Sequence, residues 1–392
     1  MTLVRQGDSI GDVTPIELFY DLVYVFAVTQ LAALVDSATG FDIVVRTAVL
    51  LAMVWQVWIY TTWFTNYLDP NRPSIRLSLV LLMLASLVLA AGIPRAFGTW
   101  GMAVAVGYVV MQLGRSVFAA IGLRGHELQL VFLRILPWTV AAAVPMLLGG
   151  YWHGHVREAL WALAVAIELG GAAIGFATPW FGRSETSEWT IDGSHFAERC
   201  QAFVLIALGE SIIVSGERLA EIEHLHASEV AAFAMAFLAS VALWWIYFDR
   251  AAADSARKIA ESDDPGRLAR DAFHWVHPII LAGIIVDAAA THEVLADPLR
   301  HGSMKAAWLM VSGSALFLGG HAIFKAVVWR QASWQRIVAV VALLGILPIA
   351  PHVSSLAFAA PVLAIVLAVI VADRVQHNAM DAAASTPRQT QA

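Results

Sequence analysis

Apolar residues along the chain are gathered into long blocks, and short polar stretches separate these blocks. The blocks hold about 20 residues, the length at which a helix rising about 1.5 Å per residue crosses about 30 Å of hydrocarbon. The pattern predicts transmembrane helices near residues 15–36, 43–66, 76–94, 100–122, 130–150, 157–180, 197–216, 228–249, 272–292, 304–329, 335–353 and 356–374. The expected fold is therefore all-α, a polytopic transmembrane helical bundle of about twelve spans.

The composition agrees with a membrane protein and excludes several other classes. Hydrophobic residues make up 59% of the chain and charged residues 14%, against about 25% charged residues in soluble domains. A net charge of −6 lacks the basic footprint of nucleic-acid binding. Cys200 is the single cysteine, which rules out an intrachain disulfide and a cysteine-based zinc site. The expected partners are membrane lipid and a small ion or solute, with no nucleic acid, and oligomerisation stays open.

The lysine and arginine residues set the expected orientation. With a cytoplasmic N-terminus, 18 of the 24 Lys and Arg residues fall in cytoplasmic segments of a twelve-span chain and 6 fall outside, as the positive-inside rule requires. The first apolar run has no small-residue cleavage site before or after it, so we expect the first helix to be retained. The predicted location is the cytoplasmic membrane, with both termini cytoplasmic.

The two halves of the sequence share landmarks in the same order. Glu17 aligns with Glu198 and Thr29 with Glu210 at one offset, and a Trp-Ile-Tyr triplet occurs in both the second and the eighth span. Six spans per half predict two parallel six-helix repeats, related by an axis along the membrane normal. The alternative is chance similarity between helices rich in Leu, Ala and Val. The expected divisions are a cytoplasmic segment 1–14, a first half 15–180, a linker 181–194, a second half 195–374 and a disordered cytoplasmic tail 375–392.

The first predicted helix begins with two carboxylates. Glu17 and Asp21 are four residues apart and share a helix face with Tyr20 and Tyr24, after a Pro at the first helical position. Each carboxylate costs about 2.5–3.5 kcal/mol at the centre of a membrane helix, so we interpret them as functional candidates. The alternative for Glu17 is a favourable interaction with the positive end of the helix dipole.

The seventh predicted helix carries a second group of charged residues. Glu198 occupies the position equivalent to Glu17, and His195 and Arg199 flank Glu198 and could pair with it. Glu210 lies about 18 Å further along the helix axis, near the membrane midplane, where a carboxylate must face protein or water. The alternative for Glu210 is a hydrogen-bonded group that only fixes helix packing.

Other ionisable residues also lie within predicted spans. Arg115 and Glu168 are candidate charge partners for the acids, and His321 is a candidate proton relay because the imidazole titrates near neutral pH. Asp287 and Lys325 are further candidates.

The histidines occur as short pairs that do not predict a metal site. The pairs are His153 with His155, His224 with His226, and His274 with His277. None has the spacing of a zinc hydrolase motif, and a zinc site needs three or four ligands. We therefore expect no metal and no cofactor.

Four segments together resemble a known family. They are residues 14–26, the aromatic end of the second span at 63–69, the segment 195–211, and the aromatic segment 244–249. They are similar to the low temperature requirement A (LtrA) family over nearly the whole chain. The resemblance implies a bacterial multi-pass inner-membrane protein of a family named for a growth phenotype in the cold. It implies no particular biochemical activity.

These observations leave three functional hypotheses. The first is a secondary transporter or channel-like protein, proton-coupled, with a path between the halves and with Asp21, Glu210 and His321 as titratable groups. The second is a membrane-embedded enzyme acting on a lipid or lipid-linked precursor, which would need a cleft open to lipid that collects Glu17, Asp21, Glu198 and a histidine. The third is a non-catalytic, stress-related membrane protein with a fully packed interior. We expect the chain not to be an enzyme.

Reporter fusions test the predicted topology. Fusions after Gln129, after Arg257 and at the C-terminus should report a cytoplasmic location, because an even number of spans precedes each. Fusions near Gly154 and His224 should report an external location. An external C-terminus would overturn the twelve-span topology.

Overall fold

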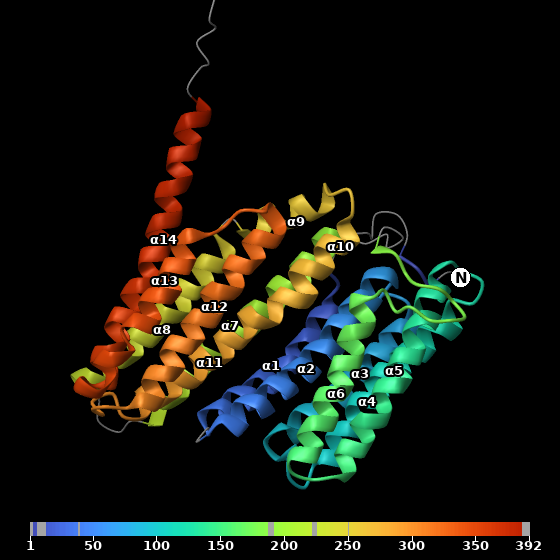
Figure 1. The fold of residues 1–392 in the computed structure, drawn as a ribbon, viewed down its shortest axis with the longest axis horizontal. Helices are drawn as coiled ribbons and strands as arrows, with labels where there is room; N and C mark the ends of the chain where they lie inside the picture. Colours follow the sequence, from blue (N-terminus) through green and yellow to red (C-terminus); the bar gives the residue numbers. More distant parts are fainter. Residues whose placement is uncertain are drawn as a thin grey trace, which may run out of the picture. The chain divides into compact units, whose positions relative to one another are not determined.

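The computed structural model describes residues 3–5, 13–37, 40–186, 192–221, 226–249 and 251–385. Within these ranges the regular structure is helical, and β-structure is limited to three isolated bridges. The α-helices labelled in Figure 1 are α1 (Pro15–Asp36), α2 (Phe41–Tyr67), α3 (Pro73–Gly92), α4 (Gly101–Gly122), α5 (Leu128–Tyr151), α6 (His155–Ala173), α7 (Gly193–Glu221), α8 (Ala227–Phe248), α9 (Ala251–Ala260), α10 (Pro265–Ala269), α11 (His277–Ala296), α12 (Met304–Trp329), α13 (Trp334–Gly345) and α14 (Ser355–Ser385). Short 3₁₀ helices η2 (Ile93–Arg95) and η5 (Leu347–His352) follow α3 and α13, and a π-helix η4 (Arg270–Val276) precedes α11.

Helices lie at all twelve predicted ranges, which gives an all-α polytopic bundle. Ten helical stretches among the described residues are long and apolar enough to cross a membrane. Helices α6 and α7 lie at predicted spans but are not among these ten. Arg157, Glu158 and Glu168 lower the hydropathy of α6, and α7 carries even more charged residues. The count of twelve spans therefore stays a prediction, and charge on these two helices is the physical reason that ten rather than twelve stand out.

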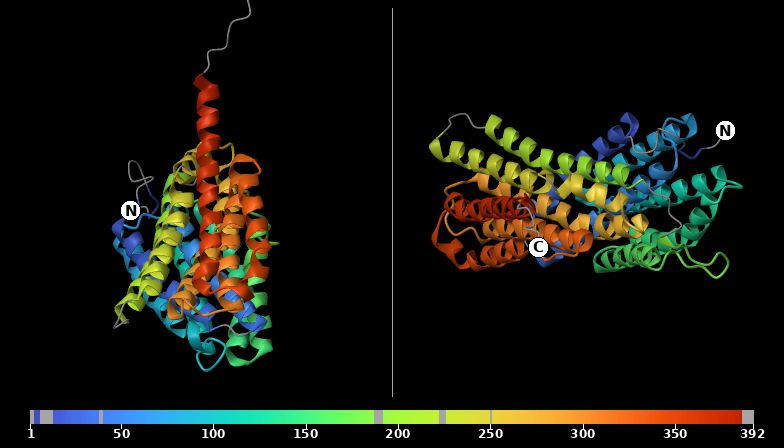
Figure 2. Two further views of the ribbon diagram at one scale, coloured as in Figure 1. Left: turned by 90° about the vertical axis from the view of Figure 1, so that its left-hand side faces the viewer. Right: turned by 90° about the horizontal axis from the view of Figure 1, so that it is seen from above.

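The C-terminal helix is longer than its sequence pattern predicts. We expected disorder from residue 375, whereas α14 continues as a helix to Ser385. Figure 2 shows α14, in red, extending past the ends of the neighbouring helices of its own unit. Residues 386–392 lie outside the described residues.

The chain divides into two compact units. Unit 1 comprises Met1–Glu210 with Ala253–Pro278, and unit 2 comprises Ser211–Ala252 with Ile279–Ala392. The units differ from the expected sequence halves because the first part of α7 and the segment α10–η4 both pack in unit 1. The duplication of six-helix halves stays a prediction.

Helix α2 forms the centre of unit 1. Every residue from Met53 to Leu68 is buried, and α1, α4 and α6 all pack against α2. The other two helices lie around this group. Helix α3 packs against α1 and α4, and helix α5 packs against α4 and α6. A helix buried on every side can present polar groups in several directions at once, and α2 does so through Trp58, Thr61 and Thr65.

Unit 2 contains a close crossing of α11 and α12. A Cβ atom at Gly283 would lie 2.4 Å from the backbone nitrogen of Phe317 and 2.8 Å from the carbonyl oxygen of Gly313. A Cβ at Gly313 would lie 2.9 Å from the backbone nitrogen of Asp287. Glycines at both positions let the two backbones touch, as small residues do in membrane helix pairs.

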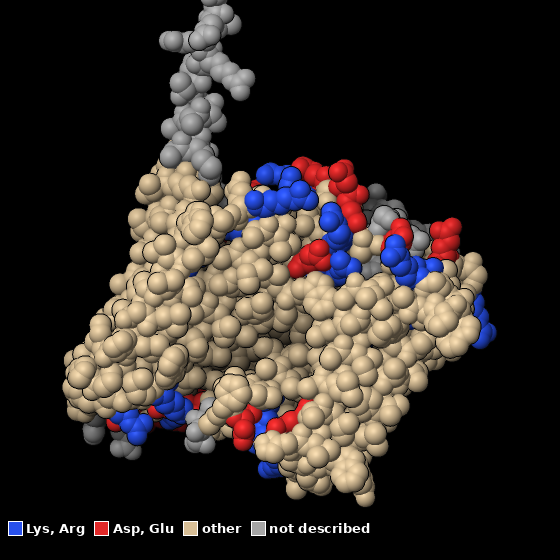
Figure 3. All heavy atoms as spheres, viewed as in Figure 1, with Lys and Arg blue, Asp and Glu red and all other residues tan. Residues whose placement is uncertain are grey.

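The surface agrees with a position in a bilayer. On the face shown in Figure 3, charged side chains gather near the ends of the helices, and the surface between them is uncharged. Helix α3 exposes Leu77, Leu81 and Leu84, each about 60% accessible. A large exposed apolar surface of this kind marks contact with lipid or protein.

Alanine substitutions of glycines on α11 and α12 should separate the effect of steric overlap on stability from the effect of helix propensity. Gly283→Ala should lower the melting temperature of the detergent-solubilised protein, because overpacking against backbone atoms costs about 1–3 kcal/mol. Gly319→Ala on α12 is the matched control, since a Cβ there meets nothing within 4 Å and alanine gains about 1 kcal/mol of helix propensity. Fluorescence-detected size exclusion after heating measures both. Equal melting temperatures would contradict the close crossing.

Candidate functional site

The start of α1 positions the two carboxylates predicted from the sequence. Thr14 is the N-cap in an extended conformation, and Pro15 occupies the first helical position. The Glu17 side chain turns back toward the cap, where its Oε2 accepts hydrogen bonds from the backbone nitrogen and the hydroxyl of Thr14, both at 2.9 Å. Glu17 and Asp21 are both fully buried, with 0% exposure. The Glu17 carboxylate thus lies at the start of α1, so the helix-dipole alternative stays open.

Two arginines neutralise these acids. The Arg199 Nε donates to Asp21 Oδ2 at 2.8 Å, and its Nη1 donates to Glu17 Oε1 at 3.1 Å. The Arg5 Nη2 donates to Glu17 Oε2 at 3.0 Å. We call Arg5, Glu17, Asp21, His195 and Arg199 the ion cluster. Its two carboxylates and two guanidinium groups balance in charge, as burial of charged groups requires.

Helix α2 closes the ion cluster. The indole nitrogen of Trp58 donates to Asp21 Oδ1 at 2.7 Å, and the Arg199 guanidinium lies 5.8 Å from the centre of the Trp58 ring. Thr65 accepts from both arginines, through its hydroxyl from Arg199 at 3.1 Å and through its carbonyl from Arg5 at 2.8 Å. The cluster thus joins α1, α2 and α7 without access to solvent.

His195 is held in place through both of its ring nitrogens. The Asn66 Oδ1 accepts from the backbone nitrogen of Asp192, which orients the amide so that Nδ2 faces the Asp192 carbonyl at 3.0 Å and His195 Nδ1 at 3.1 Å. The His195 Nε2 lies 2.9 Å from Glu17 Oε1 and 3.0 Å from Arg5 Nη2, so the ring joins both of these charged groups.

Asp192 fixes the start of α7. Its Oδ1 accepts from the backbone nitrogens of Ser194 and His195 at 2.8 and 3.0 Å and from the Ser194 hydroxyl at 2.5 Å. Partial burial would raise the pKa of Asp192, but the hydrogen bonds from Ser194 and His195 outweigh it and hold the pKa below its usual range. By fixing the first turn of α7, this cap sets the direction in which the side chains of His195 and Arg199 project from the helix.

The predicted pairing of Glu198 is wrong. Glu198 is exposed, and its expected partners His195 and Arg199 bind Glu17 instead. The reason is helical geometry. Residues 195 and 199 are four apart and share the face toward α1, whereas adjacent residues differ by about 100° around the axis. Glu198 therefore points away from the ion cluster.

Glu210 is buried, as predicted, with 2% exposure. It accepts a hydrogen bond from the Thr29 hydroxyl at 2.5 Å. Contacts of α1 with α7 thus run in order from Glu17 with His195 to Thr29 with Glu210, so the two helices run in the same direction over this length. This is the direction that a parallel repeat requires.

Arg115 and Glu168 form a second buried network, separate from the acids that we expected them to neutralise. Gln112 joins them, since its Oε1 accepts from Arg115 Nη2 and its Nε2 donates to Glu168 Oε2 at 2.7 Å. Tyr108 also donates to Glu168 Oε2. Arg115 Nη1 donates to the Thr61 hydroxyl at 3.2 Å. All of these partners of Arg115 are neutral.

The remaining candidates lie in unit 2. His321 is buried among aromatic rings, with Tyr247 edge-on at 5.6 Å and Phe317 at 5.4 Å between ring centres. Lys325 lies 4.0 Å from Asp373, which Arg336 also binds. Asp287, the remaining acid among the candidates, lines a pocket of unit 2.

The histidine pairs do not gather further ligands. Among the described residues, no group of three or more His, Cys, Asp or Glu side chains lies as metal ligands would. His224 lies outside the described residues.

The fold and these interior charges define a multi-pass helical membrane protein. The chain belongs to the bacterial low temperature requirement A (LtrA) family, whose model matches residues 12–371, and this confirms the resemblance of the sequence motifs. The chain is also 33% identical over 358 residues to "Uncharacterized protein RA0937" of Rhizobium meliloti (strain 1021), and the match covers 91% of this chain and 87% of that protein. No solved structure matches it.

Variants of Arg199 test whether the ion cluster stabilises the fold. Arg199→Gln leaves two buried carboxylates with one guanidinium, and we expect a loss of about 3–5 kcal/mol of stability, seen as reduced yield and a lower melting temperature. Glu198→Gln changes the adjacent, exposed residue and should match the wild type. Adding Asp21→Asn to Arg199→Gln should restore part of the loss because charge balance returns. Equal stability of Arg199→Gln and Glu198→Gln would refute this role.

Proposed function

We propose that this protein is a proton-coupled secondary transporter or channel-like protein in which Asp287 takes up and releases the proton. One observation carries the proposal. Asp287 lies in the apolar helix α11 and is 7% exposed. No described residue forms an ion pair with it, and its Oδ2 has no hydrogen-bond partner among them. A carboxylate in that position is costly to keep.

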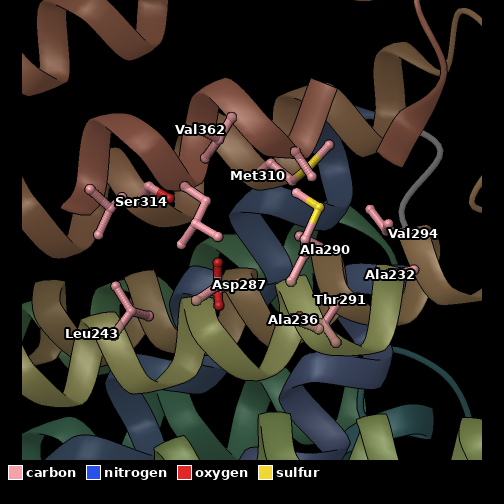
Figure 4. Close-up of a pocket in the computed structure, with 15 residues that line it drawn as sticks. Ala232, Ala236, Leu243, Asp287, Ala290, Thr291, Val294, Met310, Ser314 and Val362 are labelled. Atoms are coloured by element: carbon pink, nitrogen blue, oxygen red, sulfur yellow. The ribbon is translucent and has the colours of Figure 1, made fainter. Parts of the chain in front are cut away.

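Space beside Asp287 supports the proposal. In Figure 4 the carboxyl group points into a pocket between Leu243 of α8, Ser314 of α12 and Val362 of α14. The pocket spans about 550 Å³ of space between side chains, part of it open to the surroundings. A carboxylate that faces such a space can meet water or a solute, whereas one in a filled core cannot. Its walls are otherwise mostly Ala, Val, Leu and Met.

The acids of the ion cluster have a different role in this proposal. Glu17 and Asp21 are each bound to a guanidinium group, so protonation of either would leave a buried arginine uncompensated. We therefore move the titratable role that we expected for Asp21 to Asp287. Glu210 and His321, both buried, stay candidates for proton relay.

The alternative of a membrane-embedded enzyme gains no support from the geometry. That hypothesis needed Glu17, Asp21, Glu198 and a histidine in one cleft open to lipid. Glu198 is exposed apart from the others, and Glu17, Asp21 and His195 are buried and bonded to one another. A fully packed interior, which a purely structural protein would have, does not agree with the pocket at Asp287.

Proteoliposomes test the proposal. Purified protein is reconstituted with a trapped pH-sensitive dye, and potassium, small osmolytes and small organic acids are added one at a time under a set pH gradient. We expect proton movement with at least one solute, and Asp287→Asn should reduce it to the level of protein-free liposomes. Glu293→Gln is the control, because Glu293 lies on the same helix but pairs with Lys305 at 2.7 Å. Wild-type flux from Asp287→Asn, or no flux from the wild type with any solute, would overturn the proposal.

A further inference from the structure

Arg115 of unit 1 is a buried cation that the carboxylate of Glu168 reaches only through the Gln112 amide, without direct contact. It is 4% exposed, and no described acid forms an ion pair with it. It donates hydrogen bonds to the carbonyl of Val57, the hydroxyl of Thr61 and the amide oxygen of Gln112, all of them neutral groups. Buried charges are normally paired because desolvation costs several kcal/mol. An anion that bound beside Arg115 would form the direct pair that Glu168 does not form.

A pocket lies next to Arg115. It spans about 570 Å³ of space between side chains, part of it open to the surroundings, and aromatic rings form much of its wall, including Tyr60, Phe132 and Phe176. The Arg115 guanidinium lies 5.3 Å from the centre of the Tyr60 ring. Charge and aromatic surface are therefore adjacent in one space.

The π-helix η4 supplies two more polar groups to this pocket. Arg270 and His274 both line it, and Arg270 is held by Asp271 at 3.0 Å. His274 is 3% exposed, its ring stands edge-on to Tyr60 at 5.6 Å, and its Nε2 has no hydrogen-bond partner. The Trp55 indole donates to the His274 carbonyl at 3.0 Å, which fixes the residue in place. π-Helical turns are frequent at functional sites.

We infer that this pocket binds a small organic carboxylate with an aromatic or similarly flat apolar body. Arg115 and Arg270 supply the positive charge that a carboxylate needs, and a guanidinium matches its two oxygens. The unpartnered His274 nitrogen provides a further polar contact. The aromatic walls favour a flat body over a bare inorganic anion. This inference does not depend on transport, because a protein that only senses the compound would bind it as well.

Equilibrium binding tests the inference on the full-length protein in detergent. Benzoate, phenylacetate and inorganic phosphate are titrated by calorimetry, with benzyl alcohol as the uncharged probe. We expect saturable binding of benzoate or phenylacetate, and binding of benzyl alcohol and phosphate weaker by at least about tenfold, because losing a charge-assisted pair or the apolar contact costs about 1.4 kcal/mol or more. Arg115→Gln should weaken carboxylate binding to a similar extent. Arg183→Gln, an exposed arginine outside the pocket, should not.

A pocket-filling variant keeps the test valid if Arg115→Gln fails to fold. Ile135 lines the pocket and is only partly buried, so Ile135→Trp should abolish carboxylate binding while the protein stays monodisperse in size exclusion. Absence of binding by both carboxylates to the wild type, equal binding of benzyl alcohol, or equal binding of phosphate would overturn the inference. Full binding by monodisperse Ile135→Trp would place the carboxylate elsewhere and would also overturn it.

Discussion

The ion pairs of Arg199 with Glu17 and Asp21 are the interaction on which the arrangement of α1, α2 and α7 depends. No water is available to solvate a carboxylate at 0% exposure, so each acid must meet a cation and further donors. The planar guanidinium of Arg199 can serve both acids because its donors fan out in one plane. Trp58, Thr65 and Asn66 of α2 then fill the remaining hydrogen-bonding positions around the cluster. These helices are therefore held by a polar core, in addition to apolar packing.

Direct ion pairing separates this core from the two other buried polar sites. The ion cluster contains as many guanidinium groups as carboxylates, and its groups bond to one another, which is how a structural site is satisfied. Arg115 in unit 1 and Asp287 in unit 2 each lie beside a pocket without an ion pair from any described residue. Ion pairing within the fold does not account for a buried charge that faces a pocket without a direct partner of opposite sign. Binding or proton exchange does, and this difference underlies both proposals above.

Local patterns in the sequence predicted part of this structure, and contacts between distant segments account for what they missed. Hydropathy located the helices, and the Thr-Pro start of α1 predicted its cap and its acid pair. The error at Glu198 came from matching residue types by alignment without asking which face each residue occupies. Arg5 could not be predicted as a partner, because it reaches Glu17 only after the N-terminal segment pairs with the end of α2 through the bridge between Val4 and Leu68. The π-helix that carries His274 has no signature in the hydropathy pattern.

Helix α2 also connects the ion cluster to the network of Arg115. Thr61 and Thr65 are four residues apart and thus lie on neighbouring turns of one face. The Thr65 hydroxyl accepts from Arg199, while the Thr61 hydroxyl donates to the Val57 carbonyl at 2.8 Å and accepts from Arg115 and from Tyr20 of α1 at 3.0 Å. A threonine hydroxyl can donate one hydrogen bond and accept two, so the Thr61 hydroxyl has no hydrogen-bonding position left. An anion that moved Arg115 would have to break or replace a bond at Thr61, and α1 shares that bond through Tyr20. The pocket of unit 1 is therefore coupled by direct hydrogen bonds to the helix that carries Glu17 and Asp21.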